Sequence, residues 1–579
     1  MTAAWQARPT RPEKAVPWQT RPTRLVRPTR PERAVPGQPG EDQTAAAETV
    51  VFASVRPMPL ADTPPSPEPG PRPAANPADT PAGNPRRRRL SRAVLLVIMI
   101  VQAALTLRMH NTAFEDEALY LYAGHLEIAH WLHGAALQGD YASYFSGAPV
   151  LYPVLGALAD SVGGLAAARA LSLLEMLITT GLLYGMTRRM FNERAGLCAA
   201  IVFSVAEPTL FLGNLATYDA TALCLLALAA WLVVRTAAFD WPAYLLAAPF
   251  LVLAVATKYA VLLFVPGVIV LAGFAAAPRL GRRALVVSVA LGGSTVAMLG
   301  AALYLAGGSY LTGVRSTTLD RFPGTSPTMT LLWDSAQWIG VPFVLAVIGA
   351  LAYAARSYTE PGEQVAPGGS ELRRALFGPI LAGCILLAPA EQIHIHTVVS
   401  LQKHVGFGLL LAAPIAGVGL ARVIGDHFRR AQVGIAIWGA ALVLGMTAAS
   451  NMFNSWPNSA GFVADMAHYL RPGAHYLVEA DEVPIYYLRD HPDAQPDQFT
   501  STYVISYPDK QGGYLTGDAG YVAAIKAGYF QVVAYNYQTT PAVDAVLART
   551  LAADPGYRLA DVIPNANDTV TQYIWVKSA

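Results

Sequence analysis

The feature that most constrains this chain is a series of long apolar segments. Windows of about 16–24 apolar residues recur, close to the roughly 20 that span a bilayer as a helix. They begin near Ala93, Leu165, Ala195, Ala220, Ala243, Tyr259, Leu285, Ala336, Leu376, Val405 and Val433. A chain of 579 residues that is 53% hydrophobic and 14% charged does not fit one soluble core. We therefore expect a mainly α polytopic bundle of about eleven membrane helices.

Basic residues predict the orientation of this bundle, because short cytoplasmic loops are enriched in Lys and Arg. With the N-terminus inside, one alternation puts six basic clusters on the cytoplasmic side. They are Arg86 to Arg89 with Arg92, Arg188/Arg189/Arg194, Arg235, Arg279/Arg282/Arg283, Arg356/Arg373/Arg374 and Arg422/Arg429/Arg430. The same alternation exports everything after about Met452. We expect a multi-pass protein of the cytoplasmic membrane with an extracytoplasmic C-terminal domain.

Composition divides the chain into three regions. Residues 1–92 are rich in Pro and Arg and contain a near-perfect decapeptide repeat at 8–17 and 27–36. With few large apolar side chains, they predict a disordered basic tail, either solvated or lying on anionic membrane lipids. Residues 93–453 form the predicted membrane domain.

Residues 454–579 predict a small α/β domain. Strand-like runs at 476–479, 502–506, 530–534 and 571–576 alternate with helical runs around 463–470, 521–527 and 543–552. Its many Tyr residues suit either a core or a glycan-contacting surface, and we favour a scaffold.

Three consecutive acids, Glu115, Asp116 and Glu117, follow the first apolar segment. Ionised groups beside hydrocarbon are costly and often face a cavity or a substrate. The alternative is a solvated loop that caps the next helix, where the helix dipole favours acids. The residues alone leave both interpretations open.

The segment 114–124 (FEDEALYLYAG) resembles the first outer loop of the GT-C membrane glycosyltransferases, such as the protein O-mannosyltransferases and the lipid A aminoarabinose transferases. Four further segments resemble that superfamily in the same order: 147–153 (GAPVLYP), 165–171 (LAAARAL), 216–220 (ATYDA) and 256–259 (ATKY). The likeness covers roughly 93–451. Two departures are Ala148, where the family has Pro, and 402–406 (QKHVG), where it often has Arg-Tyr-Leu-x-Pro.

This resemblance implies transfer of a sugar from a polyprenyl phosphate to an acceptor hydroxyl, usually with inversion. Such a reaction needs a general base for the hydroxyl proton, and Asp116 is our candidate. Neighbouring helical residues point about 100° apart, so Glu117, the second catalytic candidate, is expected to cap or orient. Glu115 is the most peripheral acid.

Cations are expected around the leaving phosphate. Lys258, Arg169 and Lys403 are the candidates on the predicted outer side, and Lys258 is the strongest. Its alternative role is snorkelling to lipid headgroups. Asp219 is either a helix cap or, by family position, a ligand for acceptor or ion.

Two further features of the outer side are less specific. Glu391, His394, His396 and His404 suggest a possible divalent metal, although His394 and His396 do not share one helical face. The stretch 308–334, with Arg315 and Arg321, is either a closing loop or an ordinary connection. No other cofactor is expected.

The predicted function is therefore a membrane glycosyltransferase that moves mannose or another hexose or pentose. Its expected partners are a polyprenyl-phosphate sugar donor, a glycan, lipid or protein acceptor, and membrane lipids, with no nucleic acid. The alternatives are a transporter, which would use interrupted helices and charges near the midplane, and a noncatalytic envelope protein that binds glycans.

Overall fold

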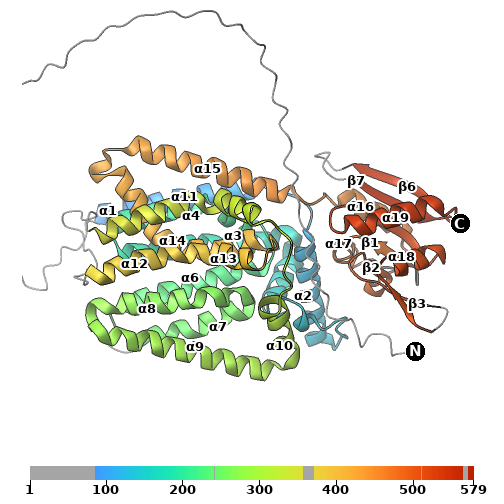
Figure 1. The fold of residues 1–579 in the computed structure, drawn as a ribbon, viewed down its shortest axis with the longest axis horizontal. Helices are drawn as coiled ribbons and strands as arrows, with labels where there is room; N and C mark the ends of the chain where they lie inside the picture. Colours follow the sequence, from blue (N-terminus) through green and yellow to red (C-terminus); the bar gives the residue numbers. More distant parts are fainter. Residues whose placement is uncertain (1–84, 240–241, 356–370, 510–511, 565–570, 579) are drawn as a thin grey trace, which may run out of the picture. The chain divides into compact units, whose positions relative to one another are not determined.

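The computed structural model describes residues 85–239, 242–355, 371–509, 512–564 and 571–578. The predicted N-terminal tail lies almost entirely outside them. From Arg89 onward the described residues belong to one compact unit. Most of it is a bundle of long helices that run alongside one another (Figure 1). The bundle contains α1 (Pro85–Leu107), α2 (Glu115–His133), α3 (Tyr152–Met190), α4 (Glu193–Ser204), α5 (Glu207–Leu212), α6 (Tyr218–Thr236), α7 (Ala247–Thr257), α8 (Val265–Leu280), α9 (Ala284–Ala306), α10 (Gly308–Val314), α11 (Thr328–Ala354), α12 (Glu371–Gly383), α13 (Leu387–His394), α14 (Leu401–Ile424) and α15 (Ala431–Phe453).

Eight segments of the described chain are long and apolar enough to span a membrane, fewer than the eleven expected. Two of the predicted windows fall in the segment Tyr259–Ala306, which counts once among the eight although a short turn at Gly281–Arg283 divides it into the hairpin of α8 and α9 (Figure 1). Two other windows fall on helices that are too short, namely α4 with 12 residues and the segment Ala243–Thr257. The mainly α polytopic fold is confirmed, and the chain is a multi-pass membrane protein.

The centre of the bundle is α14, whose spanning window is 83% buried. Glycines allow α11 to approach it closely. A Cβ on Gly349 would lie 1.9 Å from the carbonyl oxygen of Ile415, and one on Gly419 would lie 1.9 Å from that of Leu345. Such small residues are typical of membrane helix interfaces, where dispersion contacts replace the hydrophobic effect.

The C-terminal segment forms a five-stranded mixed sheet in the order β2-β1-β5-β7-β6 and a separate two-stranded ribbon of β3 and β4. In the sheet, β1 is parallel to β2 and β5, whereas β7 is antiparallel to β5 and β6. Two hydrophobic clusters cover the sheet, one with residues of α16 and the other with residues of α18 and α19. The elements are α16 (Ala460–Tyr469), β1 (His475–Val478), α17 (Glu482–Tyr487), β2 (Phe499–Ser501), β3 (Ser506–Pro508), β4 (Tyr514–Thr516), α18 (Gly517–Lys526), β5 (Phe530–Tyr535), α19 (Pro541–Ala553), β6 (Tyr557–Pro564) and β7 (Thr571–Lys577).

This small α/β domain is confirmed, and most of its predicted elements lie on observed ones. The strand expected at 502–506 is wrong, because residues 502–505 form a bend between β2 and β3. Tyr503 leaves the sheet there and donates a hydrogen bond to Glu115, 2.9 Å from Oε1. Strands β2, β3, β4 and β6 and helix α17 were also not predicted.

Candidate active site

The three consecutive acids begin α2, and each binds a different part of the chain. Glu115 accepts a hydrogen bond from Tyr503 of the C-terminal domain. Asp116 accepts one from Lys403 on α14, and Glu117 binds Arg169 on α3. Because successive helical side chains diverge by about 100°, one helical turn joins three regions that are remote in sequence.

Glu117 is fully buried and accepts four N–H groups. Arg169 binds it with both ends of the guanidinium fork, Nε at 2.8 Å from Oε1 and Nη2 at 2.6 Å from Oε2. The backbone N–H of Phe114 donates to Oε2 at 2.9 Å, and that of Ala216 to Oε1 at 2.7 Å. A carboxylate with these partners is well compensated for its burial but has little capacity left for a substrate proton.

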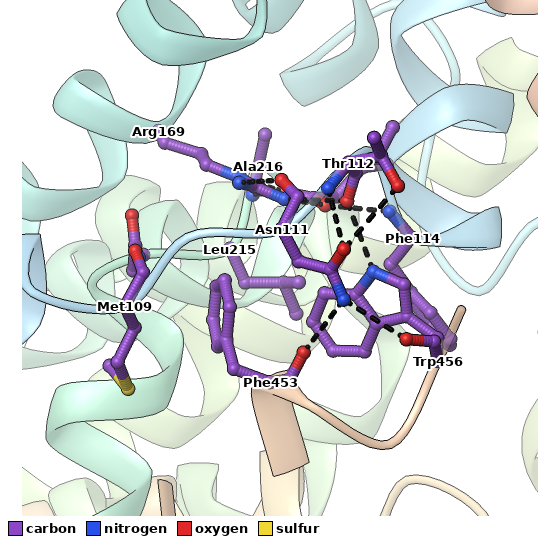
Figure 2. Close-up of polar contacts among 12 residues, drawn as sticks. Met109, Asn111, Thr112, Phe114, Arg169, Leu215, Ala216, Phe453 and Trp456 are labelled. Atoms are coloured by element: carbon purple, nitrogen blue, oxygen red, sulfur yellow. Dashed lines mark hydrogen bonds and ion pairs between the residues drawn. The ribbon is translucent and has the colours of Figure 1, made fainter. Parts of the chain in front are cut away.

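Arg169 also fixes the loop that precedes α2. Its Nη1 and Nη2 donate to the carbonyl oxygens of Asn111 and Thr112, at 2.8 and 3.2 Å. Figure 2 shows how Asn111 continues this network, with its amide donating to the carbonyl oxygens of Phe453 and Trp456, each at 3.0 Å. Arg169 therefore anchors the loop between α1 and α2, and its guanidinium is occupied by protein groups.

Asp116 is accessible, with a side chain that is 32% exposed. The ammonium of Lys403, itself buried, lies 2.5 Å from Oδ2. The hydroxyl of Tyr120, one helical turn further along α2, donates to Oδ1 at 3.2 Å. Burial and the neighbouring charge of Asp116 hold the pKa of Tyr120 well above its usual value, so this phenol remains a hydrogen-bond donor.

A second ion pair combines Asp219, at the start of α6, with Lys258, where the backbone is extended between α7 and the following 3-10 turn. Their charged atoms are 3.7 Å apart and both side chains are almost completely buried. Thr217 donates to Oδ2 of Asp219 at 3.0 Å, and Lys258 donates to the hydroxyl of Ser146 at 3.0 Å. Each pair also acts electrostatically on the other.

Several buried polar atoms in this region have no hydrogen-bond partner among the described residues. They are the hydroxyls of Tyr218 and Tyr259, Oδ1 of Asp219, Oε1 of Gln392 and Nε2 of His404. Buried polar groups are usually paired, so each orphan requires an explanation. A polar ligand bound between the two ion pairs would satisfy several of them.

A pocket with an empty volume of about 500 Å³ adjoins the same turn of α2. Its lining combines aromatic and polar groups from the loop before α2, the segment after α15 and the C-terminal domain. They include Phe114, Glu115, Trp456, Glu479, Gln538 and Gln572.

The residues considered for a metal do not form a donor set. His394 and His396 are exposed near the end of α13. Across the described residues, no group of three or more His, Cys, Asp or Glu side chains is arranged to hold an ion. The described donors therefore do not fit a structural or catalytic metal.

Sequence reasoning missed several contributors to this region. Tyr120 lies four residues after Asp116, the spacing of helical neighbours, so this contact was detectable. Tyr218 directly precedes Asp219 but is distinguished only by its burial. Ser146 and Gln392 lie in unremarkable local sequence and are brought in by tertiary structure alone.

Part of the chain matches a known protein family. The family described as dolichyl-phosphate-mannose-protein mannosyltransferase matches residues 149–305. Among curated proteins, no sequence matches the chain significantly.

Solved structures also match the chain at low sequence identity. ArnT from Cupriavidus metallidurans, solved with undecaprenyl phosphate, is 15% identical with a TM-score of 0.50, and the match covers 85% of this chain and 98% of that one. The oligosaccharyltransferase AglB from Archaeoglobus fulgidus, solved with an inhibitory peptide and a dolichol-phosphate, is 12% identical, with a TM-score of 0.49 and coverage of 86% and 75%. The mycobacterial arabinofuranosyltransferase AftD is 16% identical, with a TM-score of 0.44 and coverage of 84% and 40%.

Residues 149–305 therefore resemble a mannosyltransferase family, and the chain shares its fold with ArnT.

Proposed function

We propose that this protein transfers a sugar from a polyprenyl phosphate to an acceptor hydroxyl, with inversion at the anomeric carbon. The observation that carries the proposal is the Asp116–Lys403 ion pair beside the buried Asp219–Lys258 pair. It combines one accessible carboxylate with two cations in a region that holds unpaired polar atoms. The undecaprenyl phosphate bound to ArnT, which shares the fold, supports a polyprenyl phosphate as the donor.

Asp116 is the proposed general base. As the acceptor oxygen forms its bond to the anomeric carbon, the carboxylate takes the hydroxyl proton, and the bond from that carbon to the phosphate oxygen breaks. General base catalysis of this kind is worth roughly 10²–10⁴-fold in rate. Lys403 and Tyr120 occupy one oxygen each of Asp116. A carboxylate has about four lone-pair sites, so a site on Asp116 remains available to accept the proton of the acceptor hydroxyl.

The departing phosphate gains negative charge, which Lys258 and Lys403 are placed to stabilise. Both ammonium groups are buried, and charges act more strongly where water is excluded. Asp219 and Ser146 would hold Lys258 in position. Arg169, fully engaged with Glu117 and backbone carbonyls, would instead orient the first turn of α2 without touching the donor.

The acceptor would enter from the pocket beside Phe114 and Glu115. Its amide and carboxyl groups suit the hydroxyls of a glycan, and its aromatic walls suit a sugar ring. We place this site at the outer face of the cytoplasmic membrane, following the distribution of basic residues, and expect a hexose or pentose, such as mannose, as the transferred sugar.

The test is sugar release from radiolabelled polyprenyl-phosphate sugars by the purified full chain in lipid nanodiscs. We expect turnover with at least one donor and a loss of about 10²–10⁴-fold in Asp116→Asn. Asp320→Asn is the matched control, because Asp320 is an exposed acid paired only with exposed Arg315 in the described structure.

Two results would count against the proposal. Turnover that survives in Asp116→Asn removes Asp116 as the base. Absence of turnover with every hexose and pentose donor, in a wild-type protein that is folded, rejects the glycosyl transfer itself.

A further inference from the structure

His404 lies one residue beyond Lys403 on α14, where the sequence departs from the pattern of the superfamily. Its two ring nitrogens have different surroundings. Nδ1 is 3.4 Å from the amide nitrogen of Gln392 on α13, whereas Nε2 is buried without a hydrogen-bond partner among the described residues.

The contact with Gln392 favours one tautomer of the ring. With the amide nitrogen of Gln392 facing Nδ1, that nitrogen donates, Nδ1 accepts, and the proton of a neutral ring resides on Nε2. Gln392 is itself 1% exposed, and its Oε1 has no partner within the described part of the chain. The ring therefore presents an unused N–H group, at a cost unless a ligand accepts it.

The neighbours of this N–H group indicate which ligand it would take. Lys258, Lys403 and Arg321 all act electrostatically on the ring of His404. The positive charges of these three side chains favour an anionic oxygen as the acceptor of this N–H group. Because neutral imidazole adds a donor without a fourth positive charge, it complements the lysines instead of competing with them.

We propose that Nε2–H of His404 binds a phosphate oxygen of the lipid-linked donor, and that Gln392 is a positioning residue that fixes this tautomer. This inference rests on the proposed function for the identity of the ligand. His404 would hold the phosphate as the sugar leaves, and the lysines would supply the charge.

The variants separate the hydrogen bond from the packing of the ring. His404→Phe keeps an aromatic ring and removes the donor, whereas His404→Gln restores an N–H group near the place of Nε2. His394→Phe is the control, an exposed histidine at the end of α13. The probe is a polyprenyl phosphate without sugar, whose dissociation constant is measured with purified full-length protein in nanodiscs.

A hydrogen bond to a charged group predicts weaker binding by about 10- to 100-fold in His404→Phe. His404→Gln should recover most of this loss, and His394→Phe should match the wild type. Nitrogen-15 NMR of labelled histidine should show the Nε2–H tautomer in the wild type and a tautomer mixture in Gln392→Leu, a change that a structural role alone would not cause.

The inference is overturned if His404→Phe binds the phosphate as the wild type does, if Phe and Gln weaken binding equally, or if the proton resides on Nδ1. Wild-type protein that binds no polyprenyl phosphate also rejects it. Binding that depends on His404 without any sugar turnover would reject the proposed function alone. Sugar turnover that is unchanged in His404→Phe would reject this inference alone.

Discussion

The ammonium of Lys403 lies 2.5 Å from Oδ2 of Asp116, although 287 positions separate the two residues. This pair joins the first turn of α2 to the first turn of α14, the most buried spanning helix of the described bundle. In the proposed mechanism this pair orients the base and holds a cation beside the reacting centre.

Lys403→Met should lower kcat/KM for the sugar donor about 10- to 100-fold, because a charged hydrogen bond to Asp116 and a phosphate-facing cation are lost together. Steady-state kinetics on the purified protein measures the change. Lys526→Met is the control, since Lys526 is an exposed lysine on α18. Equal kinetics in Lys403→Met and wild type would contradict a role for this pair.

Arg169→Met should lower the free energy of unfolding by about 3–5 kcal/mol, because it leaves the buried carboxylate of Glu117 without its partner. Thermal unfolding in detergent gives the comparison. The double variant Glu117→Gln/Arg169→Met should be more stable than Arg169→Met alone, since no buried charge remains uncompensated. A double variant less stable than Arg169→Met would show that the pair does not dominate this site.

Gly349→Val should destabilise the bundle by at least about 1–3 kcal/mol through overpacking, because its first side-chain carbon would overlap the carbonyl of Ile415. Gly300→Val on α9 is the matched control, with no atom within 4 Å of the added carbon. The midpoint of thermal unfolding should fall in the first variant and stay close to wild type in the second. Similar midpoints would refute the close packing of α11 and α14.

The stability of the C-terminal domain should depend on pH through Asp544, which is fully buried. Burial, and then the nearby Glu479 carboxylate, raise the pKa of Asp544 to about 9. The folded domain thus keeps a proton that the unfolded chain releases above its ordinary pKa near 3.8. The resulting stability is fully present below that value and is lost as the pH rises to about 9.

Thermal unfolding at several pH values between 5 and 9 checks this dependence. Asp544→Asn should flatten the profile, because the amide does not titrate, whereas exposed Asp518→Asn should leave it unchanged. A wild-type profile that rises with pH over this range would show that Asp544 is ionised in the folded domain.

Local sequence predicted the fold class well but did not predict how the site is connected. Apolar windows and alternating runs reflect periodicity within one element. In the C-terminal domain they predicted strands β1, β5 and β7 and helices α16, α18 and α19, but not β2, β3, β4, β6 or α17. Helix length was less predictable: the windows near Tyr259 and Leu285 separated α8 from α9, but those near Ala195 and Ala243 fall on helices too short to span a membrane.

For the candidate site, too, local sequence identified residues but not their contacts. Asp116, Asp219 and Lys258 could be chosen because each is a charged residue next to an apolar segment and lies in its own motif. The pairing of Lys403 with Asp116 could not be predicted from the sequence, because contacts between distant helices depend on packing and leave no local pattern. The same applies to Arg169, which the sequence marked as a cation while its partner, Glu117, is defined only by the folded chain.

The four N–H groups around Glu117 also have a consequence for biogenesis. One of them belongs to Ala216, 99 residues further along the chain, so the first turn of α2 is incomplete until the chain through α5 has been synthesised and inserted. The proposed base, Asp116, gains its ion-pair partner only when Lys403, 287 residues further along the chain, has also been synthesised. A nascent chain stalled before α14 would carry the acids without their cation, and the enzyme would gain activity only late in its own synthesis.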